Sequence, residues 1–203
     1  IEEPVFEDGS DDRIRIEQVD EGINLLVPVI RPGDPATVTA TLTRLVQDHL
    51  KRFTGRETIF WYYTPAAIAF SEHLSRDLTV YDNMDELSAF KGASPDLIAQ
   101  ERALFAQANL VFTGGRSLFD AKRDCHADIH CFPSSVDTTH FHRARRHESP
   151  DPVDQAAIPH PRLGFFGVID ERFDRDLLAA MADLRPDWHW IMIGPVVKID
   201  PTS

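Results

Sequence analysis

Residues 78–117 read LTVYDNMDELSAFKGASPDLIAQERALFAQANLVFTGGRS, and this stretch decides the fold. An apolar run at residues 78–81 ends in an acidic cluster, a helical segment follows, and a second apolar run at residues 110–112 ends in Thr-Gly-Gly. This order predicts strand, helix and strand, with polar residues at the carboxyl ends of both strands. Ligands of open α/β sheets bind at those ends. We therefore expect the functional edge of the domain at residues 82–86 and 113–117.

The rest of the chain continues the alternation. A strand at residues 1–6 and a hairpin of strands at 13–18 and 23–30 come first, and we expect the hairpin to be inserted at one side of the sheet. Asp34 and Pro35 are typical of a helix start. Strands and helices then alternate to the end of the chain, which predicts an α/β fold, a Rossmann-like parallel sheet with helices on both faces.

A change of composition predicts a domain boundary. Residues 140–158 read HFHRARRHESPDPVDQAAI, which is charged, polar and interrupted by prolines. A second strand–helix–strand unit begins just after it. We expect one domain at residues 1–140, a linker at 141–161 and the start of a second domain at 162–203.

Bulk composition excludes some function classes. The net charge is -12 over 203 residues, which argues against nucleic-acid binding, since that function needs a basic face. No apolar run approaches the roughly 20 residues of a membrane helix. The two cysteines cannot form a disulfide framework, so a cytoplasmic location is the default expectation.

Several motifs in order resemble one enzyme family. YDNMDELSAF, LVFTGGRSLFDAKR, HCFPSSVDTTHF, PRLGFFGVIDERFDRDLL and WHWIMIGPV follow one another along the chain. The chain from about residue 59 onward resembles the bacterial GT-B glycosyltransferases of the glycogen-synthase-like group, in the branch of teichuronic-acid and exopolysaccharide enzymes. This resemblance implies two Rossmann-like domains that face each other across a cleft, the first holding the acceptor and the second the nucleotide-sugar.

The resemblance also sets limits. It implies that residues 1–140 lack the first strand and helix of the acceptor domain, and that the family's donor-binding pair of glutamates would follow Ser203. Residues 133–137 match the family's Pro-Asn-Gly-Val-Asp stretch, with Ser134 and Ser135 in place of Asn-Gly. The likeness therefore implies that this chain alone is inactive in sugar transfer.

Asp82 and Asp85 are the candidate catalytic residues. A carboxylate at a strand end could act as the general base of an inverting enzyme or hold acceptor hydroxyls. The alternative is helix capping, with Asp82 or Asn83 as the cap and Asp85 and Glu86 in a first helical turn, where the macrodipole favours negative charge.

The candidate acceptor-binding residues share a position at the ends of predicted strands. They are Tyr63, Glu86, Thr113, Gly115, Arg116 and Ser117. The tyrosine could stack on a sugar ring and form a wall of the cleft, whereas Trp61 is expected in the core. Capping of the following helix by Ser117 or Thr113 is the alternative for the second turn.

Gly167 and Arg172 are the candidate donor-diphosphate ligands, as the resemblance implies. Backbone N–H groups at a helix N-terminus suit an anion, and a basic residue nearby would offset the charge of the leaving group. The alternative is a tight strand-to-helix turn with a solvated arginine.

Two further clusters are a Cys/His group at residues 125–131 and a basic run at residues 140–147. Cys125 and Cys131 flank two histidines, but their spacing exceeds that of structural zinc pairs, so we expect no metal. The basic run at residues 140–147 is typical of a solvated face, with contact to an anionic lipid-linked acceptor at the inner face of the membrane as the alternative.

The resemblance implies a glycosyltransferase that moves a sugar from a nucleotide-sugar to a cell-surface polysaccharide or lipid-linked acceptor. It would need no cofactor beyond the nucleotide-sugar substrate. The alternatives are another nucleotide-sugar enzyme, such as a two-Rossmann epimerase or a protein associated with a sugar mutase, and a non-catalytic sugar-binding module.

Overall fold

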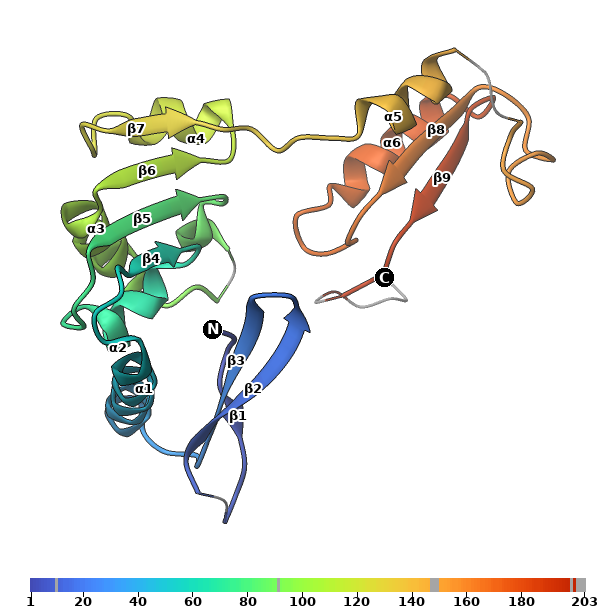
Figure 1. Cartoon of the computed structure of the whole chain (residues 1–203). Coiled ribbons are helices and arrows are strands. Elements are labelled where there is room, and N and C mark those ends of the chain that lie inside the picture. Colours follow the sequence, from blue (N-terminus) through green and yellow to red (C-terminus); the bar gives the residue numbers. More distant parts are fainter. Residues whose placement is uncertain (10, 91, 147–149, 198, 200–203) are drawn as a thin grey trace. The chain divides into compact units, whose positions relative to one another are not determined.

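The computed structural model describes residues 1–9, 11–90, 92–146, 150–197 and 199. The chain forms two compact units, Ile1–Ser135 and Val136–Ser203 (Figure 1). The boundary between the two units, after Ser135, lies earlier in the chain than the predicted end of the first domain at residue 140. Helix α5 (Thr138–Arg145) spans the predicted end of the first domain and the first part of the predicted linker, and it belongs to the second unit.

The first unit opens with a small sheet of its own. Strands β2 (Arg13–Asp20) and β3 (Ile23–Ile30) pair as the predicted antiparallel hairpin, and β1 (Val5–Phe6) runs parallel to β3. The sequence predicted that the hairpin is inserted at one side of the parallel sheet. This prediction is wrong, because the hairpin belongs to a separate sheet. Helix α1 (Pro35–Leu50) follows, and the Asp34 carboxylate accepts the N–H groups of Ala36 and Thr37 as the predicted cap.

A four-stranded, all-parallel sheet follows. Its strands are β4 (Ile59–Tyr62), β5 (Leu78–Asn83), β6 (Leu110–Thr113) and β7 (Ile129–Cys131), in the order β4-β5-β6-β7. The connecting helices are η2 (Pro65–Ala67), α2 (Ile68–Ser71), α3 (Leu97–Gln107) and α4 (Arg116–Lys122), and short 3-10 turns η1 (Lys51–Phe53) and η3 (Leu87–Ala89) complete the unit. The fold is α/β and Rossmann-like, as the sequence predicted.

One face of this sheet packs against the helices. Tyr62, Tyr81 and Val111 project from three neighbouring strands into a cluster with Leu104 and Phe105 of α3. The rings of Tyr81 and Phe105 meet edge to face, with their centroids 5.3 Å apart. Because side chains alternate along a strand, the residues between these belong to the opposite face.

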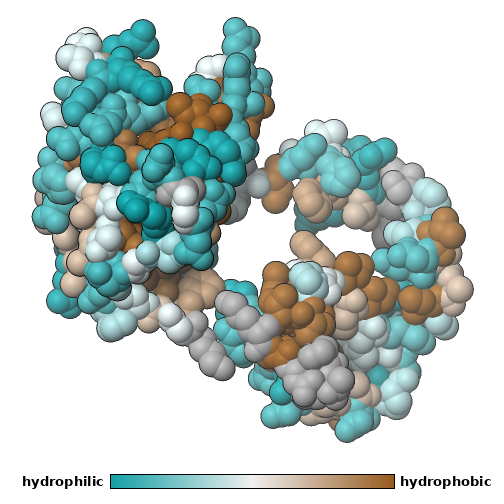
Figure 2. Space-filling model, turned by 90° about the horizontal axis from the view of Figure 1, so that it is seen from below, coloured by the Kyte–Doolittle hydropathy of each residue, from teal (hydrophilic) through white to brown (hydrophobic). Residues whose placement is uncertain are grey.

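The opposite face of the sheet carries large exposed side chains. Ile59 is 61% exposed and Trp61 is 50% exposed. The Trp61 ring stacks on Phe112 of β6 with centroids 5.7 Å apart, and Phe112 meets Phe132 edge to face at 5.0 Å. Figure 2 shows apolar residues of the first unit gathered in a hollow between two hydrophilic projections. We call the surface formed by Trp61, Phe112 and Phe132, together with the neighbouring Ile59, the aromatic face.

Besides helix α5, the second unit contains one strand–helix–strand motif. Strands β8 (Arg162–Phe166) and β9 (His189–Ile193) are parallel, and α6 (Arg175–Leu184) connects them with Asp174 as its cap. The loops after the two strands approach closely: a Cβ atom on Gly194 would overlap the carbonyl oxygen of Gly167. Both glycines also have positive φ, at 144° and 154°, so this crossing of loops requires glycine.

In the portion of the chain that the structure describes, no helix combines the length and the apolar character that membrane crossing requires.

Candidate functional site at the carboxyl ends of the parallel strands

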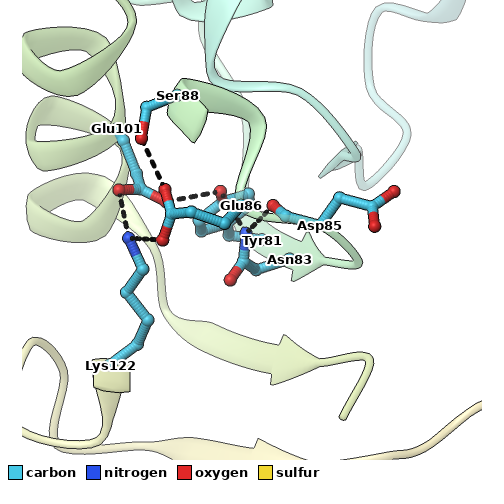
Figure 3. Close-up of polar contacts among 7 residues, drawn as sticks. All are labelled: Tyr81, Asn83, Asp85, Glu86, Ser88, Glu101 and Lys122. Carbon is cyan, nitrogen blue, oxygen red and sulfur yellow. Dashed lines mark hydrogen bonds and ion pairs between the residues drawn. The ribbon is translucent and has the colours of Figure 1, made fainter. Parts of the chain in front are cut away.

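A cluster of charged side chains joins the loop after β5 to helices α3 and α4 (Figure 3). The ammonium group of Lys122 lies 2.7 Å from Oε2 of Glu101 and 2.9 Å from Oε2 of Glu86. Ser88 donates a hydrogen bond of 2.7 Å to the other oxygen of Glu86. The lysine and Glu101 side chains are only 13% and 14% exposed, whereas Glu86 is 38% exposed, so the cation and one of its two carboxylates are largely shielded from water.

A second set of hydrogen bonds extends this cluster into β5. The Tyr81 hydroxyl donates to Oε1 of Glu101 at 3.1 Å, and the Asn83 amide nitrogen donates to the Tyr81 hydroxyl at 2.8 Å and to the backbone oxygen of Asp85 at 3.0 Å. Asn83 is fully buried, and its amide oxygen has no partner among the residues that the structure describes. The network thus fixes the strand end and the loop that follows it.

The contacts of this cluster favour the charged forms of Glu86 and Lys122 and the neutral form of Tyr81. Hydrogen bonds from Lys122 and Ser88 lower the pKa of Glu86. Burial alone would lower the pKa of Lys122, but its bonds to Glu101 and Glu86 outweigh burial and raise it. Burial, followed by the Glu101 charge, raises the pKa of Tyr81 above its ordinary value. We therefore assign the cluster a positioning role.

Asp82 lies on the other face of the sheet, beside the aromatic face. Its Oδ2 accepts a hydrogen bond of 3.2 Å from the indole Nε1 of Trp61. The expectation that Trp61 belongs to the core is wrong: β4 is an edge strand whose odd-numbered side chains point away from the helices, and half of the ring surface is exposed. A carboxylate and an exposed aromatic ring therefore lie in contact near the end of β5.

Asp85 and Glu86 take different positions. The Asp85 side chain is exposed and points away from the charged cluster in Figure 3, whereas Glu86 is bound to Lys122 and Ser88. The capping alternative is not observed for η3, since Glu86 occupies the N-cap without a side-chain hydrogen bond. Glu86 is thus occupied within the protein, and Asp85 is accessible from solvent.

The second predicted turn divides in the same way. Thr113 is fully buried and its hydroxyl donates weakly, at 3.4 Å, to the backbone of His130, which leaves it no surface for an acceptor. Gly115 occupies the N-cap position of α4, and no side chain forms a capping hydrogen bond there. Neither Thr113 nor Ser117 therefore caps this helix. Arg116 pairs with Asp120 on the helix surface at 3.2 Å, and Ser117 is exposed.

Tyr63 follows β4 directly and is 63% exposed. It lines a cavity of about 420 Å³ along the edge of β4, together with Ile1, Leu50, Ile59 and Trp61. The neighbouring Tyr62, by contrast, is buried in the core. The predicted position of Tyr63 at a solvent-accessible wall agrees with this exposure.

Gly167 and Arg172 lie in the second unit, in the long loop between β8 and α6. The N–H group of Gly167 donates to the carbonyl of Ile193, so it extends the strand pairing and is not available to a phosphate. The guanidinium of Arg172 makes a two-pronged ion pair with the buried carboxylate of Asp170, at 3.0 and 2.7 Å. Arg172 is thus the counter-charge of Asp170, and its side chain remains 58% exposed.

Across the described ranges, no three His, Cys, Asp or Glu side chains are grouped so that they could hold a metal ion. Comparison with models of known protein families and with curated proteins finds no match to this chain.

Proposed function

We propose that this chain carries the acceptor-binding half of a GT-B glycosyltransferase, which moves a sugar from a nucleotide-sugar to a saccharide or lipid-linked acceptor. The observation that carries the proposal is the contact between the Asp82 carboxylate and the half-exposed ring of Trp61. A sugar ring presents C–H groups on its faces and hydroxyl groups around its rim. An exposed indole beside a hydrogen-bond acceptor matches both.

The roles of the residues follow from their positions. The indole N–H holds one oxygen of Asp82, and in this proposal the second oxygen accepts a hydrogen bond from an acceptor hydroxyl. In an inverting reaction that hydroxyl oxygen attacks the anomeric carbon, the bond from this carbon to the diphosphate breaks, and Asp82 takes the hydroxyl proton. In a retaining reaction Asp82 positions the hydroxyl. Asp85, which is accessible on the same loop, is the second acceptor contact.

The charged cluster would hold the end of β5 in the position that this geometry requires. Lys122 ties the loop after β5 to two helices through Glu86 and Glu101, so the strand end that bears Asp82 is held in place. Correct placement of a reacting group contributes strongly to catalysis. Arg172 and the loop after β8 remain our candidates for the donor diphosphate, with the arginine as the cation.

The test begins with binding. Oligosaccharides of bacterial surface polymers are titrated into the protein, and binding is measured by calorimetry. Trp61→Ala and Asp82→Asn should each weaken binding about tenfold or more, as expected for loss of a ring contact or a hydrogen bond to a charged group. Trp188→Ala is the matched control from the second unit. Absence of saccharide binding by the unaltered protein would refute the proposal.

Because the resemblance implies that this chain alone is inactive, transfer is measured in a protein that also contains the donor-binding pair of glutamates, as release of nucleoside diphosphate from a panel of nucleotide-sugars in the presence of the bound saccharide. Release that depends on Asp82 supports the glycosyltransferase. Saccharide binding without any release favours the non-catalytic sugar-binding module, which uses the same contact between Trp61 and Asp82 but needs no donor.

A further inference from the structure

Helix α5 is a basic helix whose own residues are all exposed. It spans eight residues and carries two histidines and two arginines, with Arg146 as its C-cap, and no acidic residue lies within it. Helices this short are marginal in water unless something packs against them. In a protein of net charge -12, this segment is also a local concentration of positive charge, which indicates an anionic counterpart.

The side chains of α5 converge on one side. Thr139, His142, Arg143 and Arg146 are spaced at i, i+3, i+4 and i+7, which places them on one helical face. Together with Thr138 they line an open cavity of about 510 Å³. This volume lies in the range of small-ligand pockets.

The lining is unusual in its chemistry. Among the residues that the structure describes, it contains two hydroxyl groups, an imidazole and two guanidinium groups and no carboxylate, and Arg146 also has a further interaction within the protein. Arg143 has neither a hydrogen bond nor an ion pair with any residue that the structure describes. Arginine presents a planar fork of N–H groups that matches two oxygens of a phosphate. A set of donors of this kind suits a group that is anionic and has several acceptor oxygens.

We propose that this face of α5 binds a phosphate-bearing ligand, a free phosphate ester or diphosphate or the headgroup of an anionic lipid. A nucleic acid fits less well, because the overall negative charge would repel a long polyanion. The site is defined by its own residues and does not depend on the proposed sugar transfer.

The test uses the full chain and inorganic pyrophosphate as the probe, titrated by calorimetry at low salt. The double variant Arg143→Ala/Arg146→Ala should bind pyrophosphate at least about tenfold more weakly, as loss of hydrogen bonds to a charged group predicts. Both side chains are exposed and alanine favours helices, so the variant should retain its circular dichroism and melting temperature.

The matched control removes the same charge elsewhere. Arg102 on α3 and Arg123 at the end of α4 are also exposed arginines, so Arg102→Ala/Arg123→Ala changes the net charge equally but should leave pyrophosphate affinity within about twofold. Equal loss in both double variants would mean that only the overall charge matters, and it would overturn the proposal. Unchanged affinity in the α5 variant would overturn it as well.

Vesicles distinguish the two sources of phosphate. Sedimentation with phosphatidylglycerol vesicles, compared with phosphatidylcholine vesicles, reports headgroup binding. Binding to anionic vesicles that the α5 variant loses, without binding of pyrophosphate, assigns the site to a lipid headgroup. Binding of pyrophosphate without vesicle binding assigns it to a free ligand. Binding of neither probe by the unaltered protein refutes the site.

Discussion

Replacement of Lys122 by methionine tests whether the charged cluster holds the functional end of the sheet together. Methionine keeps most of the apolar length of the side chain but removes the cation from between two carboxylates. Glu101 is 14% exposed and cannot regain its water, whereas Glu86 is 38% exposed and partly can. Removal of one partner of a buried ion pair costs about 3–5 kcal/mol. Since only one of the two carboxylates is well buried, we expect the low end, about 3 kcal/mol.

The assay is hydrogen exchange, followed peptide by peptide over β5 and β6, because it reports on the first unit alone. A loss of about 3 kcal/mol corresponds to exchange roughly a hundredfold faster. The control is Lys51→Met: its pair with Asp48, at 2.7 Å, is 69% and 52% exposed, and such pairs contribute about 0–1 kcal/mol.

A rescue variant separates charge from packing. In Lys122→Met/Glu101→Gln the buried unpaired charge of Glu101 is gone, while the new amide oxygen can still accept the Tyr81 hydroxyl, so slower exchange than in Lys122→Met is expected. If Lys122→Met accelerates exchange no more than Lys51→Met does, the cluster is not a structural support and the reasoning fails.

Three further predictions follow from single contacts. Gly194→Ala should unfold the second unit, seen as loss of protection in its strands, because a Cβ there overlaps the Gly167 carbonyl; retained protection would contradict the close crossing. Tyr62→Phe removes a buried hydrogen bond of 2.8 Å to Ser71 and should destabilise the first unit by about 1 kcal/mol in the same exchange assay. The pKa of Glu86 lies below its ordinary 4.5, so its stabilisation is complete above that pH and disappears as the pH falls through the lower folded value. Glu86→Gln should therefore reduce the loss of stability that the protein shows as the pH falls below the ordinary pKa of a glutamate.

The sequence predicted the parallel sheet because its signals are local. The strand at Leu78–Asn83 is an apolar run that ends in polar residues. The start of α1 is indicated by two adjacent residues, the N-cap Asp34 and Pro35. Both features need no knowledge of the rest of the chain. The α5 helix was interpreted as linker because it lacks an apolar stripe, which is the signal by which most helices are recognised.

The charged cluster could not be predicted in the same way. Lys122 lies 36 positions after Glu86 and 21 after Glu101, and nothing in the local pattern pairs them. Their meeting depends on α3 and α4 both packing against the same side of the sheet. Sequence reasoning placed Glu86 correctly near the strand end but could not see that a lysine occupies it.

The strand order explains the misplacement of Trp61. Parallel strands joined by right-handed crossovers put each connecting helix on the same side when the order advances in one direction. Here the order is β4-β5-β6-β7, and the ion pair between Lys122 of α4 and Glu101 of α3 is direct evidence that these helices share a face. The apolar run at residues 58–62 was predicted to be a buried strand, and in such a strand every apolar residue would belong to the core. With the helices that connect β4–β7 on one face, the opposite side chains of the edge strand β4 stay accessible, and Trp61 is half exposed beside Asp82.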